Sequence, residues 1–142
     1  MTVVGEKQSN MFVGHVGIEV SSLSRSKLFY DTLLCWLGFK RTEGEFGVGF
    51  LSPTFQVWLA ESQTPRVKRE APTGEELIVA DHLALFVEKR ETVDAIQREM
   101  TRKGFEPLFP CEEHPQFTSG YYAVSFCDPD NYVVEIFTVS EA

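Results

Sequence analysis

Two histidines, one glutamine and one glutamate stand where they could bind a metal ion together. His15 and His82 each begin an apolar run, and Gln56 and Glu135 each lie inside a run rich in apolar and aromatic residues. A buried carboxylate is costly without a partner, so Glu135 requires a cation, a hydrogen-bond donor or an exposed position on an edge strand. Imidazole and carboxylate groups ligate Zn, Ni, Fe, Mn and Co, and an amide oxygen is a weaker ligand. The sequence therefore predicts a divalent-metal site, whose two histidines and glutamate match the open arrangement of non-haem Fe(II) oxygenases.

The segment around His15 is repeated around His82. Residues 15–39 and 82–105 both begin with histidine on an apolar run, continue with a helical pattern and end in Gly-Phe. The histidine and the closing glycine stand at positions 15 and 38 in the first copy and at 82 and 104 in the second. Because the two spacings differ by a single residue, the pattern indicates an internal duplication.

Each copy continues with three runs of strand character. These runs cover about 39–43, 46–51 and 54–61 in the first copy, and about 105–110, 120–127 and 132–139 in the second. The predicted fold class is α+β, with two tandem βαβββ modules that form a cupped mixed β-sheet with the helices on the outside. We expect a flexible N-terminal tail at 1–10 and a single domain at 11–142. The domain divides into module 1 at about 11–62, a polar linker at about 63–77 and module 2 at about 78–140.

Single residues predict the helix ends and one turn. Ser22 or Ser24 could cap the first helix. Gly38 and Gly104 lie where a left-handed residue commonly ends a helix. Asn131, in the turn Asp-Pro-Asp-Asn at 128–131, can adopt the same backbone conformation.

The last strand of each copy indicates which polar residues share a cleft. Phe-Gln-Val-Trp at 55–58 aligns with Val-Glu-Ile-Phe at 134–137, which places Gln56 at the position of Glu135. Side chains alternate between the two faces of a strand, so both histidines, Gln56 and Glu135 can point into one cleft. A lone histidine on an apolar strand is more often a core residue, and it is the repetition that favours ligands here.

Composition excludes several kinds of partner. The formal net charge of −8 provides no basic face for nucleic acid, and no apolar run reaches the roughly 18 residues of a membrane span. Three widely spaced cysteines without a CxxC pair indicate a reducing compartment, which we take to be the cytoplasm. Twelve phenylalanines, four tyrosines and two tryptophans suit an apolar cleft. The aromatic residues expected to bind substrate are Phe50, Trp58, Tyr122 and Phe137.

Four segments of the chain carry a resemblance to known proteins. They are HVGIEV at 15–20, SRSKLFYDTLL with the following LGF up to residue 39, HLALFV at 82–87, and GYYAVSFCDPDNYVVEIF at 120–137. They resemble the vicinal oxygen chelate superfamily, which includes glyoxalase I, bleomycin-resistance proteins, fosfomycin-resistance thiol transferases and extradiol dioxygenases. That family usually has Asp-Pro-Asp-Gly-Asn before its ligand glutamate, and here Asn131 replaces the glycine and Tyr132 the asparagine. The resemblance implies paired βαβββ modules, a homodimer, a small-molecule substrate and metal ligands at His15, Gln56, His82 and Glu135.

The resemblance favours an enzyme. The leading expectation is a divalent-metal-dependent lyase or isomerase of glyoxalase I type, which acts on a small oxygenated substrate through a metal-stabilised enediolate with Glu135 as catalytic base. One alternative is an extradiol-type dioxygenase, with His114 and either Tyr121 or Tyr122 as acid–base groups. The other is a metal-free, bleomycin-resistance-like protein that holds an aromatic, cationic drug in its cleft.

Overall fold

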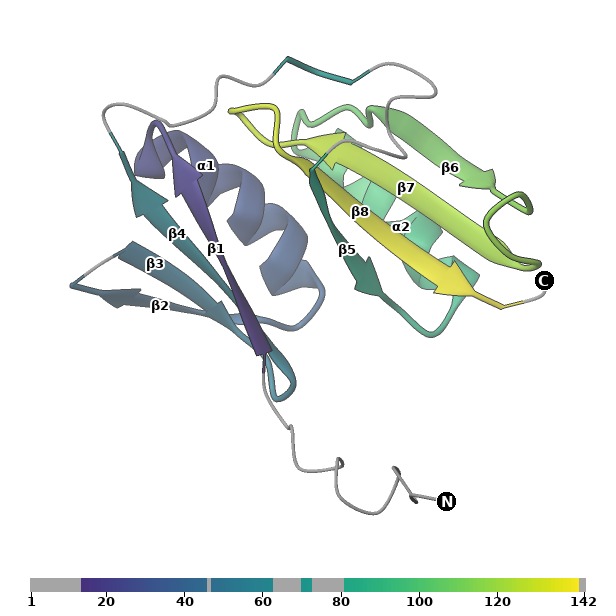
Figure 1. Cartoon of the computed structure of the whole chain (residues 1–142), viewed down its shortest axis with the longest axis horizontal. Coiled ribbons are helices and arrows are strands. Elements are labelled where there is room, and N and C mark those ends of the chain that lie inside the picture. The colour runs from purple at the N-terminus through teal and green to yellow at the C-terminus, as the bar shows by residue number, and fades with distance from the viewer. Residues whose placement is uncertain (1–13, 46, 63–69, 73–80, 141–142) are drawn as a thin grey trace, which may run out of the picture.

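The computed structural model describes residues 14–45, 47–62, 70–72 and 81–140 (Figure 1). Its elements in chain order are β1 (Gly14–Val20), α1 (Leu23–Tyr30), the π-helical turn η1 (Asp31–Cys35), β2 (Lys40–Gly44), β3 (Gly47–Leu51), β4 (Phe55–Glu61), β5 (His82–Phe86), α2 (Arg90–Arg102), β6 (Phe109–Glu113), β7 (Tyr121–Cys127) and β8 (Val133–Val139). The βαβββ order occurs twice, which confirms the predicted α+β fold. The predicted tail at 1–10 and most of the predicted linker lie outside the described residues.

Within the described residues, each module forms one four-stranded mixed sheet. The strand orders are β1-β4-β3-β2 and β5-β8-β7-β6. In both sheets the first strand of the module pairs in parallel with the last, and the other pairings are antiparallel. The strands that carry Gln56 and Glu135 are therefore interior strands, which rules out an edge-strand position for Glu135.

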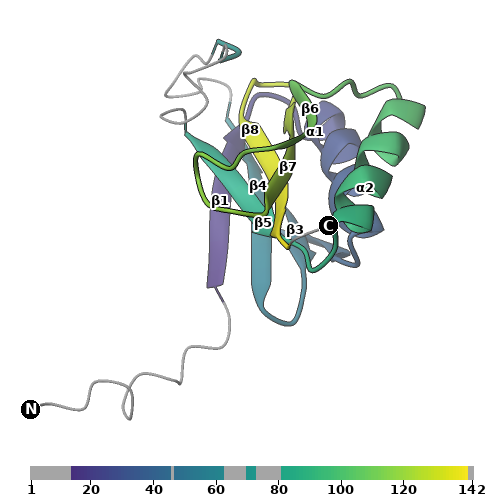
Figure 2. The ribbon, with the colours of Figure 1, turned by 90° about the vertical axis from the view of Figure 1, so that its right-hand side faces the viewer.

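Each sheet has one face covered by a helix and one open face. Residues of the two faces alternate along a strand, so Val57 and Leu59 of β4, like Val134 and Ile136 of β8, are buried on the helix side. Figure 2 shows α1 and α2 together on one side of the molecule and the sheets on the other. The open faces carry the alternate strand residues, Glu135 among them.

Short-range signals set the helix ends. Ser22 is the N-cap of α1, and its hydroxyl accepts a hydrogen bond from the Arg25 backbone N–H (3.4 Å), which confirms one of the two predicted caps. Gly38, Gly104 and Asn131 have φ of +99°, +92° and +63°. These values confirm the three predicted left-handed positions.

Aromatic packing joins the two modules in one core. Phe29 of α1 meets Phe105, just beyond α2, edge to face with ring centroids 5.4 Å apart. A single hydrophobic cluster contains buried residues of both modules. The two modules therefore share their interior rather than forming separate cores.

The turn between β7 and β8 connects module 2 to module 1. The Tyr30 hydroxyl donates to the buried Asp128 carboxylate (2.8 Å). The backbone N–H and the hydroxyl of Ser21 both donate to Asp130 (2.9 and 2.5 Å). The turn that precedes the strand of Glu135 is thus held by residues between β1 and η1.

The strand β6 begins later than predicted. We expected a strand at 105–110, but β6 spans Phe109–Glu113. The Phe105 N–H donates to the Met100 carbonyl (2.8 Å) in the turn that ends α2, so it is not available for sheet pairing. No helix in the described part of the chain is both long and apolar enough to span a membrane.

Candidate functional site

The four predicted metal ligands lie on the open faces of the two sheets. His15 and Gln56 are directly paired on β1 and β4, and alternation places both opposite the helix-facing Val57. By the same alternation, His82 and Glu135 lie on the open face of module 2. Both histidines are exposed, whereas Glu135 is only 4% exposed.

The strand pairings show that Gln56 is not the counterpart of Glu135. In module 1 the opening histidine pairs with Gln56, whereas in module 2 the opening histidine pairs with Val133. Glu135 lies two residues beyond Val133, and the residue two beyond Gln56 is Trp58. The predicted alignment is therefore wrong by two residues, and Trp58 occupies in module 1 the position that Glu135 occupies in module 2.

The third strands give the same correspondence. Leu51 at the end of β3 pairs with Gln56, and Cys127 at the end of β7 pairs with Val133. The turn between the third and last strands differs in length. In module 1 the Ser52 N–H donates to the Phe55 carbonyl and closes the turn (2.9 Å). In module 2 the Asp128 N–H donates to the Tyr132 carbonyl and closes the turn (2.9 Å). The second turn is thus longer by one residue. Because strands have a period of two, a shift of two residues keeps every side chain on the same face, and the sequence pattern fits both registers.

Trp58 lies across the open face of module 1. Its indole N–H donates to the Gln56 Oε1 (3.0 Å), so this amide orients the ring. A Cβ atom on Gly49, the β3 partner of Trp58, would lie 2.6 Å from the indole, and one on Gly44 would lie 4.0 Å away. On the other flank, a Cβ on Gly17, the β1 partner, would meet no atom within 4 Å. The indole therefore leans over the glycines of β2 and β3 and leaves an open floor at Gly17.

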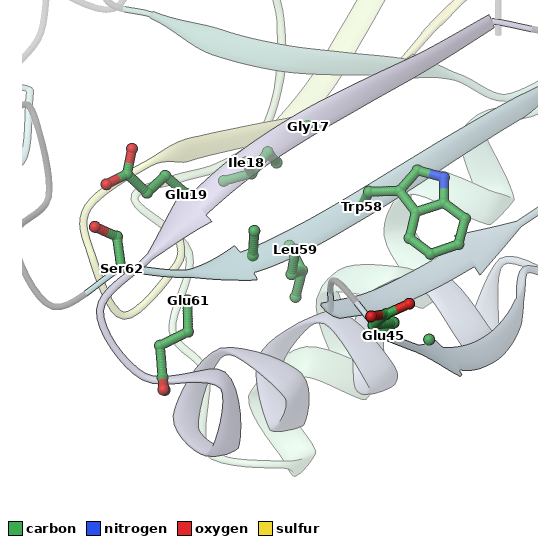
Figure 3. A pocket seen from close by; sticks show the side chains of 10 residues that line it. Gly17, Ile18, Glu19, Glu45, Trp58, Leu59, Glu61 and Ser62 are labelled. Carbon is green, nitrogen blue, oxygen red and sulfur yellow. The ribbon is translucent and has the colours of Figure 1, made fainter.

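A pocket of about 970 Å³ adjoins Trp58 (Figure 3). The carboxylates of Glu19 and Glu45 line it, and within the described residues neither forms an ion pair. A third lining carboxylate, Glu61, accepts the Leu23 N–H at the start of α1 (2.9 Å) and has a structural role there. The pocket thus combines an aromatic ring with two carboxylates that form no ion pair with any described residue.

Glu135 lies near the middle of the open face of module 2. Its Oε2 accepts a hydrogen bond from the Tyr121 hydroxyl (2.5 Å). The Tyr121 ring stacks on Phe137 with centroids 5.0 Å apart, and Phe117 meets it edge-on at 5.3 Å. Burial, with the adjacent Glu135, raises the pKa of the Tyr121 hydroxyl far above its ordinary value, so Tyr121 remains a donor at neutral pH.

Two aromatic residues predicted to bind substrate lie elsewhere. Phe50 is fully buried on the helix side of β3. Tyr122 faces α2, where its hydroxyl donates to Asp94 (2.6 Å) and the Arg90 guanidinium lies 4.7 Å from its ring centroid. Strand alternation directs both away from the open face, and it is Tyr121, not Tyr122, that lies beside Glu135.

The family model described as the Glyoxalase/Bleomycin resistance protein/Dioxygenase superfamily matches residues 12–136 of this chain. The chain belongs to this superfamily. It is 28% identical over 124 residues to the uncharacterized protein YqjT of Bacillus subtilis (strain 168), with 86% of this chain and 94% of YqjT covered.

Solved structures with this superfamily fold resemble the chain over most of its length. A proposed glyoxalase from Bacillus halodurans has 26% identity and a TM-score of 0.68, with 92% of this chain and 96% of that one covered. Lactoylglutathione lyase from Agrobacterium tumefaciens has 15% identity and a TM-score of 0.65, with 92% and 96% covered. The second likeness concerns the fold alone.

The superfamily resemblance implies a divalent metal, but the described side chains of one chain do not form a site for one. In the described part of the chain, no three His, Cys, Asp or Glu side chains lie close enough to hold a metal ion. The Gln56 oxygen accepts from Trp58, and one Glu135 oxygen accepts from Tyr121. The described side chains therefore do not fit a metal ion held within a single chain. A ligand set of His15, Gln56, His82 and Glu135 stays a prediction.

The cysteines offer no activated nucleophile. All three are free thiols. Burial raises the pKa of Cys111 to about 11, and burial together with the neighbouring Asp128 raises the pKa of Cys127. Burial and Asp31 act in the same direction on the pKa of Cys35. Because the thiolate is the nucleophile, these environments disfavour thiol chemistry at neutral pH.

Proposed function

We propose that this protein binds a small, flat organic cation in the pocket beside Trp58. The observation that carries the proposal is Trp58 itself, which stands in module 1 where module 2 has a carboxylate, with Glu19 and Glu45 lining the same pocket. A cation over an indole face gains about 0.5–2 kcal/mol. The net charge of −8 adds a long-range attraction for cations.

The surroundings of Trp58 suit a planar ligand. The indole is held by Gln56 and by its contact with Gly49, so little side-chain freedom is lost when a ring stacks on it. The open floor at Gly17 leaves room for that ring beside the indole. A binding role also makes use of Gln56 as it stands, as the residue that orients Trp58.

Calorimetric titration with ethidium, a planar aromatic cation, tests this proposal. We expect Trp58→Ala to weaken ethidium binding at least about tenfold, because the ring loses its stacking wall and a desolvated cation–π contact. Trp36→Phe, which changes the other tryptophan, outside this pocket, should leave the affinity unchanged and serves as the matched control. Wild-type affinity in Trp58→Ala would contradict the proposal, as would equal affinity for phenanthridine, the uncharged parent ring.

A metal-dependent enzyme is the second candidate, and the buried Glu135 favours it. A glyoxalase I-like lyase or isomerase would use Glu135 as the base next to an enediolate, and a dioxygenase would draw on His114, whose ring stacks on Phe117 beside Tyr121 (5.3 Å). Zn, Ni, Fe, Mn or Co would supply Lewis acidity in either reaction. Elemental analysis tests this candidate: about one equivalent of metal that is lost in both His82→Ala and Glu135→Ala would support it.

We further propose a homodimer in the cytoplasm. Three free cysteines accord with a reducing compartment. Exposed aromatic side chains on the open face of module 2, such as Phe86 and Phe117, accord with a partner surface. Sedimentation at several protein concentrations tests the dimer.

A further inference from the structure

The carboxylate of Glu135 has fewer hydrogen bonds than its burial demands. It is 4% exposed, and within the described residues the Tyr121 hydroxyl is its one hydrogen-bond partner, at Oε2. An ionised carboxylate offers about four acceptor positions, and each one left empty in a buried site costs free energy. One Glu135 oxygen is therefore left with no donor from the described protein.

A second buried polar group with no partner lies directly across from Glu135. Ser125 of β7 is the strand partner of Glu135 and is 2% exposed. Its hydroxyl has no hydrogen-bond partner among the described residues. Val124 and Phe126 point to the helix side, so alternation places Ser125 on the open face with Glu135. Within the described residues, the Ser125 hydroxyl and one oxygen of Glu135 thus lie on the same face without a hydrogen-bond donor, and both can accept a hydrogen bond.

Three aromatic side chains lie on the same face beside Glu135. Phe137 stacks on Tyr121, and Phe86 meets Phe137 edge-on with centroids 5.5 Å apart. Phe86 is 59% exposed, and Ala84, the β5 partner of Glu135, is exposed as well. The exposed residues that lie next to Glu135 on this face are therefore on β5.

We propose that Glu135 and Ser125 form a second binding site, which takes the primary ammonium group of a small organic amine. An ammonium group has three N–H donors and a positive charge. It can donate to the free Glu135 oxygen and to the Ser125 hydroxyl while Phe86 and Phe137 contact the carbon next to it. The site is independent of the Trp58 pocket in module 1, so either can fail without the other.

Within one chain, the described donors at this site suit an ammonium group better than a metal ion. A metal ion needs three or more protein donors or waters in a fixed geometry, and the described residues provide no such group here. Tyr121 donates to Glu135 and keeps one oxygen occupied, which suits a single further donor on the other oxygen. The hydroxyl of Ser125 adds directional selectivity for N–H over C–H groups.

Titration with benzylammonium, with benzyl alcohol as the uncharged counterpart, tests the site by calorimetry and by ligand-observed NMR. We expect Glu135→Gln to weaken benzylammonium binding by about tenfold or more, because a charge-assisted hydrogen bond is lost. Ser125→Ala should weaken it about threefold to tenfold, through loss of a neutral hydrogen bond. Thr138→Val is the matched control, since the Thr138 hydroxyl is equally buried and without a partner but lies on the helix side of β8, and it should leave binding unchanged.

Thermal unfolding gives a readout that separates a binding role from a structural one. Glu135→Gln keeps an acceptor for Tyr121 and removes a buried charge, so its melting temperature without ligand should equal or exceed that of the wild type. Benzylammonium should raise the melting temperature of the wild type and of Trp58→Ala, but not that of Glu135→Gln. The proposal is overturned by equal binding of benzyl alcohol, by wild-type affinity in Glu135→Gln, or by no binding at any benzylammonium concentration. It is also overturned if Zn or Ni alone binds at Glu135 and excludes benzylammonium.

Discussion

A tryptophan can lie flat across a strand only where its neighbours leave space for the ring. Gly49 provides that space, because a Cβ atom at this position would lie 2.6 Å from the indole of Trp58. With alanine at position 49, the indole N–H could still donate to Gln56, but the ring would have to rotate away from β3. A single methyl group at position 49 therefore tests how the pocket is shaped.

We expect Gly49→Ala to displace Trp58 and to weaken ethidium binding, at a cost in stability of about 1–3 kcal/mol from overpacking. Gly17→Ala is the matched control for stability, since a Cβ there meets nothing within 4 Å and should be tolerated in the fold. Tryptophan emission in the Trp36→Phe background reports the position of Trp58 alone. An emission spectrum unchanged by Gly49→Ala would contradict this account.

The sequence predicts which face of a strand a residue occupies better than it predicts which residue of the neighbouring strand it pairs with. The period-two pattern predicted that Gln56 and Glu135 face away from the helices, and the strand pairings agree, but it could not separate registers two residues apart. The hydrogen bonds that close the turn at Asp128–Tyr132 make it one residue longer than the turn in module 1, whereas the predicted alignment needed a turn three residues longer. Tyr121 was missed as the partner of Glu135 for the same reason, because finding it requires the pairing of Ser125 with Glu135.

At the scale of elements, the turn between β7 and β8 carries a buried charge. Asp128 accepts hydrogen bonds from the Tyr30 hydroxyl and from the backbone N–H groups of Asp130 and Tyr132 (all 2.8 Å). Desolvation nevertheless dominates and raises the pKa of Asp128 above its ordinary value of 3.8. The folded protein therefore binds a proton at this carboxyl more readily than the unfolded chain.

This shift predicts a pH dependence of stability with a defined sign. A raised folded-state pKa means that the contribution of Asp128 to stability falls as the pH rises from about 3.8 through the folded-state pKa. Asp128→Asn keeps an oxygen for the two backbone donors and removes the ionisation, so the wild type should lose stability relative to this variant over that range. Urea unfolding from about pH 3.5 to about pH 7, a range that brackets ordinary carboxyl pKa values, measures this difference in the free energy of unfolding.

A half-buried carboxylate, Glu99 of α2, provides the control of opposite sign. The hydrogen bond from Arg102 lowers the pKa of Glu99, so its contribution is present at neutral pH and is lost as the pH falls. Glu99→Gln should therefore change relative stability in the other direction, and weakly, because the partner Arg102 is exposed and water screens the pair. A pH dependence of the same sign in both variants would contradict the assignment to Asp128.

Element boundaries follow from local chemistry where a cap or a left-handed residue fixes them. Residue type alone predicts the left-handed Gly38 and Gly104, and it narrows the N-cap of α1 to Ser22 or Ser24, of which the structure uses Ser22. The start of β6 was not, since Phe105 looks like a strand residue but its N–H closes the turn after α2. Strand propensity does not take that competing hydrogen bond into account.

At the scale of the whole molecule, the shared core predicts a single unfolding transition. Phe29 is fully buried and contacts Phe105 across the two modules. Phe29→Ala should cost about 3–5 kcal/mol and lower the stability of both modules together. Both tryptophans lie in module 1, whereas three of the four tyrosines lie in module 2, so fluorescence and tyrosine absorbance report the modules separately.

Coincident transitions by the two signals, in the wild type and in Phe29→Ala, are the expected result. Leu28→Ala is the control, because Leu28 is 60% exposed on the same helix and its loss should cost little. Separate transitions would show that each module unfolds on its own, contrary to the common core.

Trp58 and Glu135 occupy one position in two copies of a single motif. A substitution at that position in one copy leaves the backbone and the chemistry of the other copy as they were. Duplication thus allows each module to bind a different chemical group, an aromatic ring at Trp58 and an ammonium group at Glu135. A scaffold of this kind is suited to two chemically unlike ligands, one for each copy.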